Sequence, residues 1–330
     1  MSSRTQSALN LLGPVLALAL LVAIFGGAEF WQRGESTFLS LRNFRSIAVQ
    51  ASPVLMGALG MTLVIIAGGI DLSVGTLAAL AAMTLGLTLV HEQGAALAVG
   101  ACILTGLVGG TLNGALISYL RMPAFIVTLG TMTIFLGLAK LSNNNNPVRP
   151  LESQLPEWMS SFLATTPPDG WPFFSPGVWL VLGLAVLIAV VLRYTVAGRY
   201  VYALGSNERA AELSGIAVVR FKVMIYGLAG IFFALAGLYI FCRNNQQGSP
   251  TEGAGFELKV IAAVVVGGAS LQGGRGTILG TCCGTAIIAV VNSGCVQLGI
   301  RNELQDILLG LIVISAVAID QWRLRRTSSS

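Results

Sequence analysis

Long apolar runs without a single charge recur along almost the whole chain, and they constrain its fold more than any other feature. Residues 178–192 and 261–268 are two examples. Only 10% of the 330 residues are charged, against roughly a quarter in an average soluble protein. Because each backbone polar group inside a bilayer must find a partner within the chain, such runs form helices. The sequence therefore predicts an all-α polytopic membrane protein, with residues 1–330 in a single transmembrane domain.

The apolar runs, bounded by charges, prolines and polar clusters, predict about ten membrane-spanning helices. A helix needs about 20 apolar residues to cross the hydrocarbon. We interpret the first run as a retained span and not as a cleaved signal peptide, because nothing downstream resembles a secreted domain. Ten crossings put both termini on the same side of the membrane. The predicted spans are residues 9–27, 47–67, 72–90, 94–120, 123–141, 177–195, 221–242, 256–271, 276–299 and 303–321.

The positions of Lys and Arg predict that this side is the cytoplasm. With the N terminus inside, the inner segments hold eleven of the 19 basic residues, in line with the excess usual for cytoplasmic loops. Three arginines in the first outer loop run against this bias. In this orientation residues 196–220 form a cytoplasmic segment and residues 142–176 a periplasmic loop. That loop holds seven of the 11 prolines and is either a tolerated surface loop or a docking surface for an extracytoplasmic partner.

Two glycine ladders predict close helix packing, since small residues on one helix face let a neighbouring backbone approach. The segments GTLNGALI (110–117) and GTCCGTAI (280–287) are also alike and lie five predicted spans apart. Because an odd offset reverses direction across the membrane, this likeness suggests a 5+5 inverted repeat. The ladders consist of Gly106, Gly110 and Gly114, and of Gly276, Gly280 and Gly284.

The segment GGIDLSVG, residues 68–75, interrupts two apolar runs with an acidic residue. A carboxylate at this depth is costly unless it caps a broken helix or faces a wet cavity. We expect Gly68 and Gly69 to break the helix, and Asp71 to cap the span beginning at Leu72 by accepting hydrogen bonds from its first N–H groups. A direct role of Asp71 in a pathway across the membrane is the alternative.

Several other polar side chains lie inside predicted spans. They either line a pathway for a hydroxylated solute or bond neighbouring helices, which is the commoner use. Phe125 belongs to the same set of candidate pathway residues. The polar members are Asn113, Thr128, Thr131, Asn292 and Gln297.

The chain shows no pattern typical of an enzyme. The glycine-rich residues 267–277 lack the Gly-Lys-Ser/Thr of a nucleotide-binding Walker A loop, because Gly274 and Arg275 follow Gly273. The single histidine, His91, and five cysteines without a CxxC pair predict neither a metal site nor a catalytic triad. We expect no cofactor on this chain, so any ATP must be hydrolysed on another subunit.

The segment ALGSNERAAELSGI, residues 203–216, is a polar, helix-favouring insert between apolar runs. Ser206 or Asn207 can cap a helix of about two turns, Glu208 suits its first turn, and Gly215 supplies a left-handed stop. So short a helix is marginal alone and must lean on something. It either packs on its own chain at the membrane surface or inserts into a cytoplasmic partner. Its small contact surface is Ala210, Ala211 and Leu213, and its charges are Glu208, Arg209 and Glu212.

This insert closely resembles the cytoplasmic coupling segment of permease subunits from ribose-, xylose- and galactose-type ABC importers. One departure from the family pattern is Lys259, where an acidic or small residue is expected; it bears on substrate identity and on the charge of the outer face. The resemblance covers about residues 37–320. Its further motifs are TFLSLRNF (37–44), GGIDLSVG, PAFIVTLGTM (123–132), GFELKVIAAVVVGGASLQGGRGT (255–277) and VNSGCVQLGI (291–300).

The resemblance implies a homodimer of ten-span subunits in the bacterial inner membrane, with a monosaccharide path along the dimer axis. Each coupling helix would sit in a groove of a cytoplasmic ABC ATPase, and a periplasmic sugar-binding protein would dock outside. Membrane lipid is the remaining partner, and no nucleic acid is expected. The implied coupling residues are Gly205, Ser206, Asn207, Glu208, Arg209, Ala210, Ala211, Leu213 and Gly215.

Two alternatives stay open. Permeases for branched-chain amino acids share the fold, but they are expected to carry a different segment in place of GSNERAAELSGI. An ion- or proton-coupled secondary carrier would need ionisable residues inside the membrane, where Asp71 is the only good candidate.

Overall fold

The computed structural model describes residues 3–328, and within them the side chains of residues 13–318 except Arg33, Val313 and Ala316. The described chain is helical, with one isolated antiparallel β-bridge between Val148 and Gly248. The helices are α1 (Ser3–Arg33), α2 (Leu41–Ile66), α3 (Val74–Val90), α4 (Ala95–Tyr119), α5 (Ala124–Leu141), η1 (Glu152–Gln154), α6 (Glu157–Ser161), α7 (Pro176–Tyr194), α8 (Val196–Ser206), α9 (Glu208–Leu213), α10 (Val218–Arg243), α11 (Phe256–Val266), α12 (Ile278–Gln297) and α13 (Asn302–Ser328).

Each predicted span coincides with one of these helices, although the boundaries differ. Helix α11 has 11 residues and ends at Val266, before the predicted residue 271. The reason is that Gly267 and Gly268 turn the chain, Gly268 with a left-handed φ of +91° that favours glycine. Within the described residues, seven helices are long and apolar enough to cross a bilayer, namely α1, α2, α4, α5, α7, α10 and α12. The prediction of a polytopic α-helical membrane protein is confirmed.

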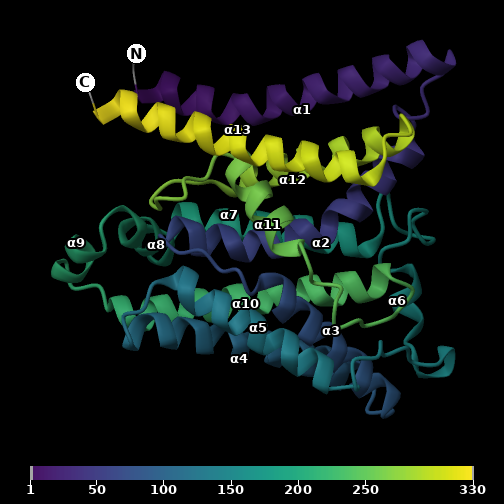
Figure 1. Cartoon of the computed structure of the whole chain (residues 1–330), viewed down its shortest axis with the longest axis horizontal. Helices are drawn as coiled ribbons and strands as arrows, with labels where there is room; N and C mark the ends of the chain where they lie inside the picture. Colours follow the sequence, from purple (N-terminus) through teal and green to yellow (C-terminus); the bar gives the residue numbers. More distant parts are fainter. Residues whose placement is uncertain (1–2, 329–330) are drawn as a thin grey trace.

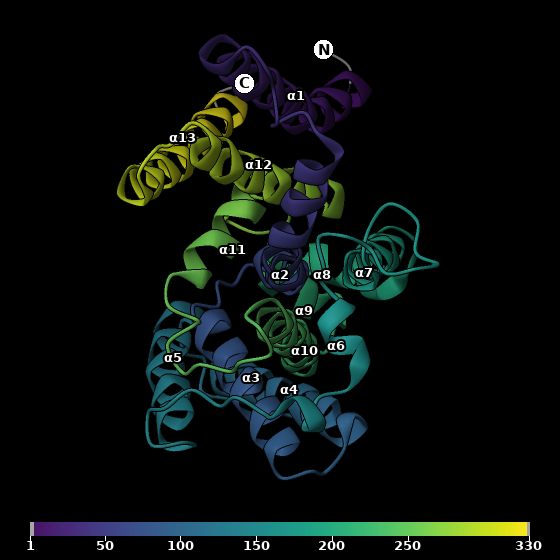
Figure 2. The same cartoon turned by 90° about the vertical axis from the view of Figure 1, so that its right-hand side faces the viewer.

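Helices α2 and α10 form the centre of the molecule (Figure 2). Helix α10 packs against α4, α2 and α3, and α12 packs against α2, α11 and α1. Every residue of α2 from Leu55 to Ile66 is buried, which is typical of a helix surrounded by others. Gly60 lets the two central helices touch, since a Cβ there would lie 2.9 Å from the Ala229 carbonyl oxygen.

The predicted glycine ladders lie in helix contacts. A Cβ on Gly106 would lie 2.1 Å from the Gly230 carbonyl oxygen, so α4 and α10 meet backbone to backbone. In the second ladder, a Cβ on Gly284 of α12 would lie 2.0 Å from the Ala263 carbonyl oxygen of α11. Real Cβ atoms essentially never come within 3.0 Å of another heavy atom. Both ladders therefore serve close packing, as their spacing predicts.

The short helices lie at opposite ends of the molecule. Figure 1 shows α9 projecting at the end where α1 begins and α13 finishes, whereas α6 lies at the other end. We call these the α9 end and the α6 end. Residues 196–220 and residues 142–176, which the sequence assigns to opposite sides of the membrane, thus lie at opposite ends of the fold.

Candidate functional site

Helix α9 carries both of the end signals that its sequence predicts. The side chain of Asn207 is the N-cap and accepts a hydrogen bond from the Ala210 N–H over 3.0 Å. Gly215 follows the helix with a φ of +85°, and the Ile216 N–H donates to the Ala211 carbonyl oxygen over 3.2 Å. This is the Schellman stop that glycine favours. With only six residues, α9 depends on these caps and on its contacts with α8 and α10.

Most of α9 faces away from the rest of the chain. Ala211 is buried with 4% of its surface exposed, whereas Leu213 is 85% exposed although it is a large apolar side chain. Charged and apolar groups therefore project together from the α9 end. We call the exposed part of residues 206–213 the α9 surface, and it includes Ser206, Asn207, Glu208, Arg209, Ala210, Glu212 and Leu213.

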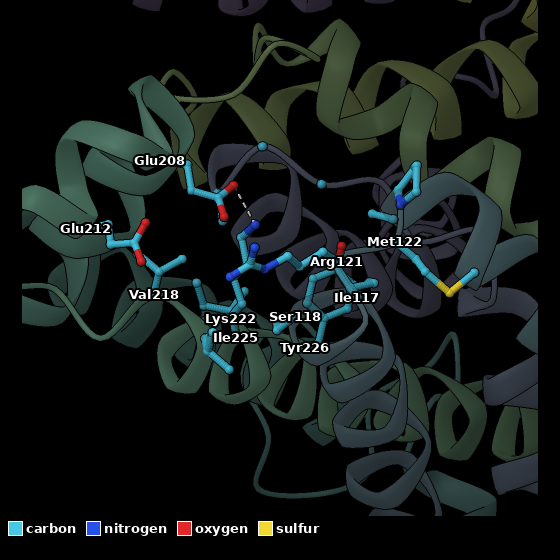
Figure 3. Close-up of a pocket in the computed structure, with 16 residues that line it drawn as sticks. Ile117, Ser118, Arg121, Met122, Glu208, Glu212, Val218, Lys222, Ile225 and Tyr226 are labelled. Carbon is cyan, nitrogen blue, oxygen red and sulfur yellow. Dashed lines mark hydrogen bonds and ion pairs between the residues drawn. The ribbon is translucent and has the colours of Figure 1, made fainter.

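One ion pair fixes α9 relative to α10. The Lys222 Nζ lies 2.6 Å from a Glu208 carboxylate oxygen, and the Lys222 side chain is only 19% exposed (Figure 3). Because the Glu208 side chain is 54% exposed, solvent screens the pair, and its contribution to stability is at most about 1 kcal/mol. The pair therefore positions α9 more than it stabilises the fold.

The C-terminal end of α8 is held by backbone contacts between glycines. A Cβ on Gly205 would lie 1.7 Å from the Ile66 carbonyl oxygen at the end of α2. Gly273, in the turn between α11 and α12, packs against the same place, because its Cβ would lie 2.7 Å from the Gly205 carbonyl oxygen and 2.8 Å from the Gly68 Cα. The Gly274 N–H donates to the same Ile66 oxygen over 2.8 Å. We call Gly68, Gly205, Gly273 and Gly274 the glycine dock.

Tyr202 adds a side-chain hydrogen bond next to the glycine dock. Its hydroxyl donates to the Gly276 carbonyl oxygen over 2.8 Å. Burial raises the pKa of the Tyr202 phenol above its ordinary value, so the group stays a neutral donor. The end of α8, which leads directly into α9, is thus attached to the end of α2 and to the turn before α12.

Asp71 lies in the break between α2 and α3 and is fully buried. One carboxylate oxygen accepts from the Ser73 N–H over 2.8 Å and from the Ser73 hydroxyl over 2.6 Å. The other accepts from the Asn113 amide nitrogen over 3.2 Å. The prediction that Asp71 caps a helix beginning at Leu72 is therefore wrong in its details, because α3 begins at Val74 and its N-cap is Ser73. The Asp71 carboxylate instead binds the backbone and side chain of that N-cap residue within the helix break.

Three of the candidate pathway residues gather around this break. Besides Asp71, Asn113 of α4 bonds the Ser73 hydroxyl over 2.9 Å. Thr128 of α5 donates to the Ile70 carbonyl oxygen over 3.3 Å, and Thr131 donates to the Thr128 carbonyl oxygen over 3.3 Å. All three are buried. In this arrangement they join segments of the chain, while the amide oxygen of Asn113 has no hydrogen-bond partner among the described residues.

A cavity of about 510 Å³ separates the α2–α3 break from α9. Its walls are the 67–69 turn, the end of α4, the start of α10 and the inner side of α9. Figure 3 shows Arg121, Lys222 and Glu208 pointing into it. The hydroxyls of Ser118 and Tyr226 also line it, and both are buried without a hydrogen-bond partner among the described residues. We call this the first cavity.

The remaining candidate pathway residues lie elsewhere. Asn292 lines a second cavity, of about 280 Å³, formed by α2, α10, α11 and α12. Phe125 is exposed on α5 and lines neither cavity. Gln297 accepts a hydrogen bond from the Thr37 hydroxyl over 3.3 Å. The six candidate pathway residues predicted from the sequence therefore do not form one continuous lining in this chain.

Residues 43–317 match the protein family described as "Branched-chain amino acid transport system / permease component". This chain belongs to that permease family. It is 36% identical to the ribose import permease protein RbsC of Escherichia coli (strain K12) over 312 residues, 93% of this chain and 92% of the relative. It is 40% identical to RbsC of Bacillus subtilis (strain 168) over 313 residues, with 94% and 92% covered. The fructose import permease protein FrcC of Rhizobium meliloti is 36% identical, with 94% and 84% covered.

One solved structure also resembles the permease. It shows an inward-facing conformation of a transporter assigned to the metal-chelate type of ABC transporters. The TM-score is 0.51 and the identity 17%, with 95% of this chain and 98% of the other covered. At that identity the likeness concerns the fold alone.

Four residues that line the first cavity could not be identified as candidates from the sequence, because only the fold brings them together. Ser118, Arg121, Lys222 and Tyr226 come from two helices and one loop, and no motif connects them along the sequence. Arg121 does carry a local signal, because its φ of +54° is unusual for a residue other than glycine, and that conformation is not visible in a sequence.

Proposed function

We propose that this permease is the transmembrane subunit of an ABC importer that carries a monosaccharide, and that it receives the work of ATP hydrolysis at α9. The observation that carries the proposal is the combination of an exposed, doubly capped α9 with the glycine dock directly behind it. A rigid helix with an exposed surface can bind a separate ATPase subunit. The glycine dock then connects α9 to the helices that line the two cavities.

The ATPase is expected to receive the α9 surface in a groove and to push it when ATP closes the ATPase. Because Gly205 packs directly against the backbone of the end of α2 and of the turn before α12, a displacement of α9 is not absorbed by a flexible loop. It is passed to the α2–α3 break and to α12 together. These elements border the first and second cavities, so their movement can open one while closing the other.

The complete importer is proposed to be a homodimer in the bacterial inner membrane. We assign ten crossings to each subunit, with a 5+5 inverted repeat and both termini in the cytoplasm. Supporting this arrangement, α1 begins and α13 ends at the α9 end (Figure 1). The loop of residues 142–176, at the opposite end, would face the periplasm and the solute-binding protein. No cofactor is assigned to this chain, and Phe125 on the exposed face of α5 stays a candidate for the path between two subunits.

The solute is proposed to be a ribose-like pentose or a hexose. Relatives that match nearly the full chain are import permeases named for ribose and fructose, at 36–40% identity. A further relative, at 31% identity, is the autoinducer 2 import permease LsrC of Yersinia enterocolitica. The family description mentions branched-chain amino acids. We favour a sugar because the coupling segment GSNERAAELSGI and the other motifs follow the sugar importers.

The experiment reverses the charges of the α9 surface. The double variant Glu208→Lys with Arg209→Glu should bind the ATPase more weakly and should lose most sugar uptake in liposomes that contain the full importer. Glu35→Lys is the control, because Glu35 is an exposed acidic residue in the loop before α2. Uptake at the wild-type rate by the double variant would refute the assignment of α9. Sugar uptake by the permease without any ATPase would indicate a secondary carrier instead.

A further inference from the structure

The second cavity lies at the other end of the same two central helices. Along α2, Val54 lines the second cavity and Ala67 the first; along α10, Ile240 lines the second and Tyr226 the first. At a rise of 1.5 Å per residue, thirteen or fourteen residues separate the cavities by about 20 Å. Between them α2 and α10 are in backbone contact at Gly60. The second cavity is therefore a compartment of its own on the α6 side of the barrier.

The lining of this cavity is unusually polar for a site bounded by apolar helices. Arg243 and Lys259 contribute donors only, Glu252 contributes acceptors only, and the amides of Gln50 and Asn292 contribute both. Lys259 and Asn292 form no side-chain hydrogen bond or ion pair within the part of the chain that the structure describes. Arg243 interacts electrostatically with Glu252, whose carboxylate also accepts from the Asn244 amide, and the Gln50 amide nitrogen donates to the Ser46 hydroxyl over 2.9 Å. Lys259, Asn292 and the amide oxygen of Gln50 are therefore the groups available to a ligand.

The cavity also has an apolar wall. Phe256 lines it with aliphatic residues of α2, α10 and α12, and its side chain is buried. An aromatic face beside planar amide and charged groups suits a molecule with C–H surfaces and many hydroxyls. The volume of about 280 Å³ is near the lower limit of roughly 300–1,000 Å³ for small-molecule sites, which favours a single sugar ring.

We propose that the second cavity is a monosaccharide-binding site of this subunit, in which Asn292, Lys259 and Gln50 read the sugar hydroxyls. A hydroxyl both donates and accepts, so one polyhydroxylated ring can satisfy the cationic, carboxylate and amide groups at once. This inference rests on the proposed transport of a monosaccharide and adds the residues that hold it. It also gives Lys259, the departure from the family pattern, a role in choosing the solute.

The test compares a sugar with its monodeoxy analogues in liposomes containing the permease, its ATPase and saturating sugar-loaded binding protein. Asn292→Ala and Lys259→Met should each slow uptake of the parent sugar roughly five- to tenfold, the effect of one lost hydrogen bond. Uptake of the analogue that lacks the hydroxyl read by that side chain should change less, so the parent-to-analogue ratio falls. A defect in folding or assembly would lower both solutes equally and leave the ratio unchanged.

Two controls match these changes. Lys140→Met removes a lysine at the end of α5, and Gln93→Ala removes an exposed amide in the loop before α4, both outside the cavities. Gln50→Ala supplies a second amide variant on another helix. If wild type imports the sugar and the cavity variants keep the wild-type ratio, the binding site is refuted while the proposed function stands. If wild type imports no monosaccharide, the proposed function fails and the site with it.

Discussion

Gly205 has no side chain, and this allows the end of α8 to pack directly against the backbone at the end of α2 and in the turn before α12. The obstacle that a Cβ would meet at 1.7 Å is the Ile66 carbonyl oxygen, which is backbone and cannot rotate away. The same oxygen accepts from the Gly274 N–H, so the contact joins three segments at one atom. A change of one methyl group at this position therefore acts on α2, α8 and the turn before α12 together.

Replacing Gly205 by Ala is expected to lower the stability of the permease. Overpacking costs about 1–3 kcal/mol, and the upper part of that range applies because backbone must move. The measurement is the midpoint of thermal unfolding (Tm) of the purified permease. Gly183→Ala in α7 is the matched control, since a Cβ there meets nothing within 4 Å. A Tm for Gly205→Ala equal to that of Gly183→Ala would contradict the glycine dock.

Asp71 and Asn113 form a pair in which one side accepts and the other donates. Asp71→Asn turns an amide N–H₂ group towards the Asn113 donor, and Asn113→Asp sets two carboxylates together. Each single change should destabilise the fold by about 1–3 kcal/mol, because a buried polar group loses its partner. The double variant, Asp71→Asn with Asn113→Asp, again places an amide donor opposite a carboxylate acceptor. Its Tm should therefore recover part of the loss seen in the single variants. Additive losses would show that the two side chains act independently.

At the scale of the elements, the sequence predicts helices well and their tertiary contacts poorly. Local rules located α9 correctly: Asn207 is its N-cap, and Gly215 has the left-handed φ. Those signals act within a few residues, so they are readable from a sequence. Other features depend on segments more than one hundred residues apart, such as the contact of Gly205 with Ile66 and the cavity shared by Ser118 and Tyr226. No local sequence pattern predicts such tertiary contacts.

The boundary errors have a similar cause. The predicted span 256–271 includes Gly267 and Gly268, which have no charge to mark the end of an apolar run, yet they end α11. The same turn occurs after α2, where Gly68 has a φ of +86°. Apolar character predicts where the membrane is, whereas backbone conformation decides where a helix stops.

The charge of Glu208 has two roles that can be tested separately: it pairs with Lys222, and it contributes to the α9 surface. Glu208→Lys alone breaks the contact with Lys222 and also reverses a charge on the α9 surface. The swap Glu208→Lys with Lys222→Glu restores the pair and keeps the reversed surface. We expect the swap to have the wild-type Tm but still to bind the ATPase weakly, measured by co-purification. Full ATPase binding by the swap would show that the pair only positions α9.

Across the whole molecule, α9 and α6 are expected to face opposite sides of the membrane. Ser160 in α6 and Ala210 in α9 are both exposed, so a cysteine at either position should be reachable. A membrane-impermeant maleimide should label Ser160→Cys from the outside of intact cells, and Ala210→Cys only after permeabilisation. The unmodified permease is the control for its five native cysteines. Labelling of Ala210→Cys from outside would reverse the orientation.

A photo-crosslinking amino acid at position 213 tests whether the ATPase binds α9. Leu213 is 85% exposed on the α9 surface, and Leu151, 67% exposed near η1, is the matched position at the other end. After illumination of the assembled importer, a crosslinking amino acid at 213 is predicted to capture the ATPase, and one at 151 is not. Capture of the ATPase at 151, with none at 213, would show that the ATPase does not bind at α9.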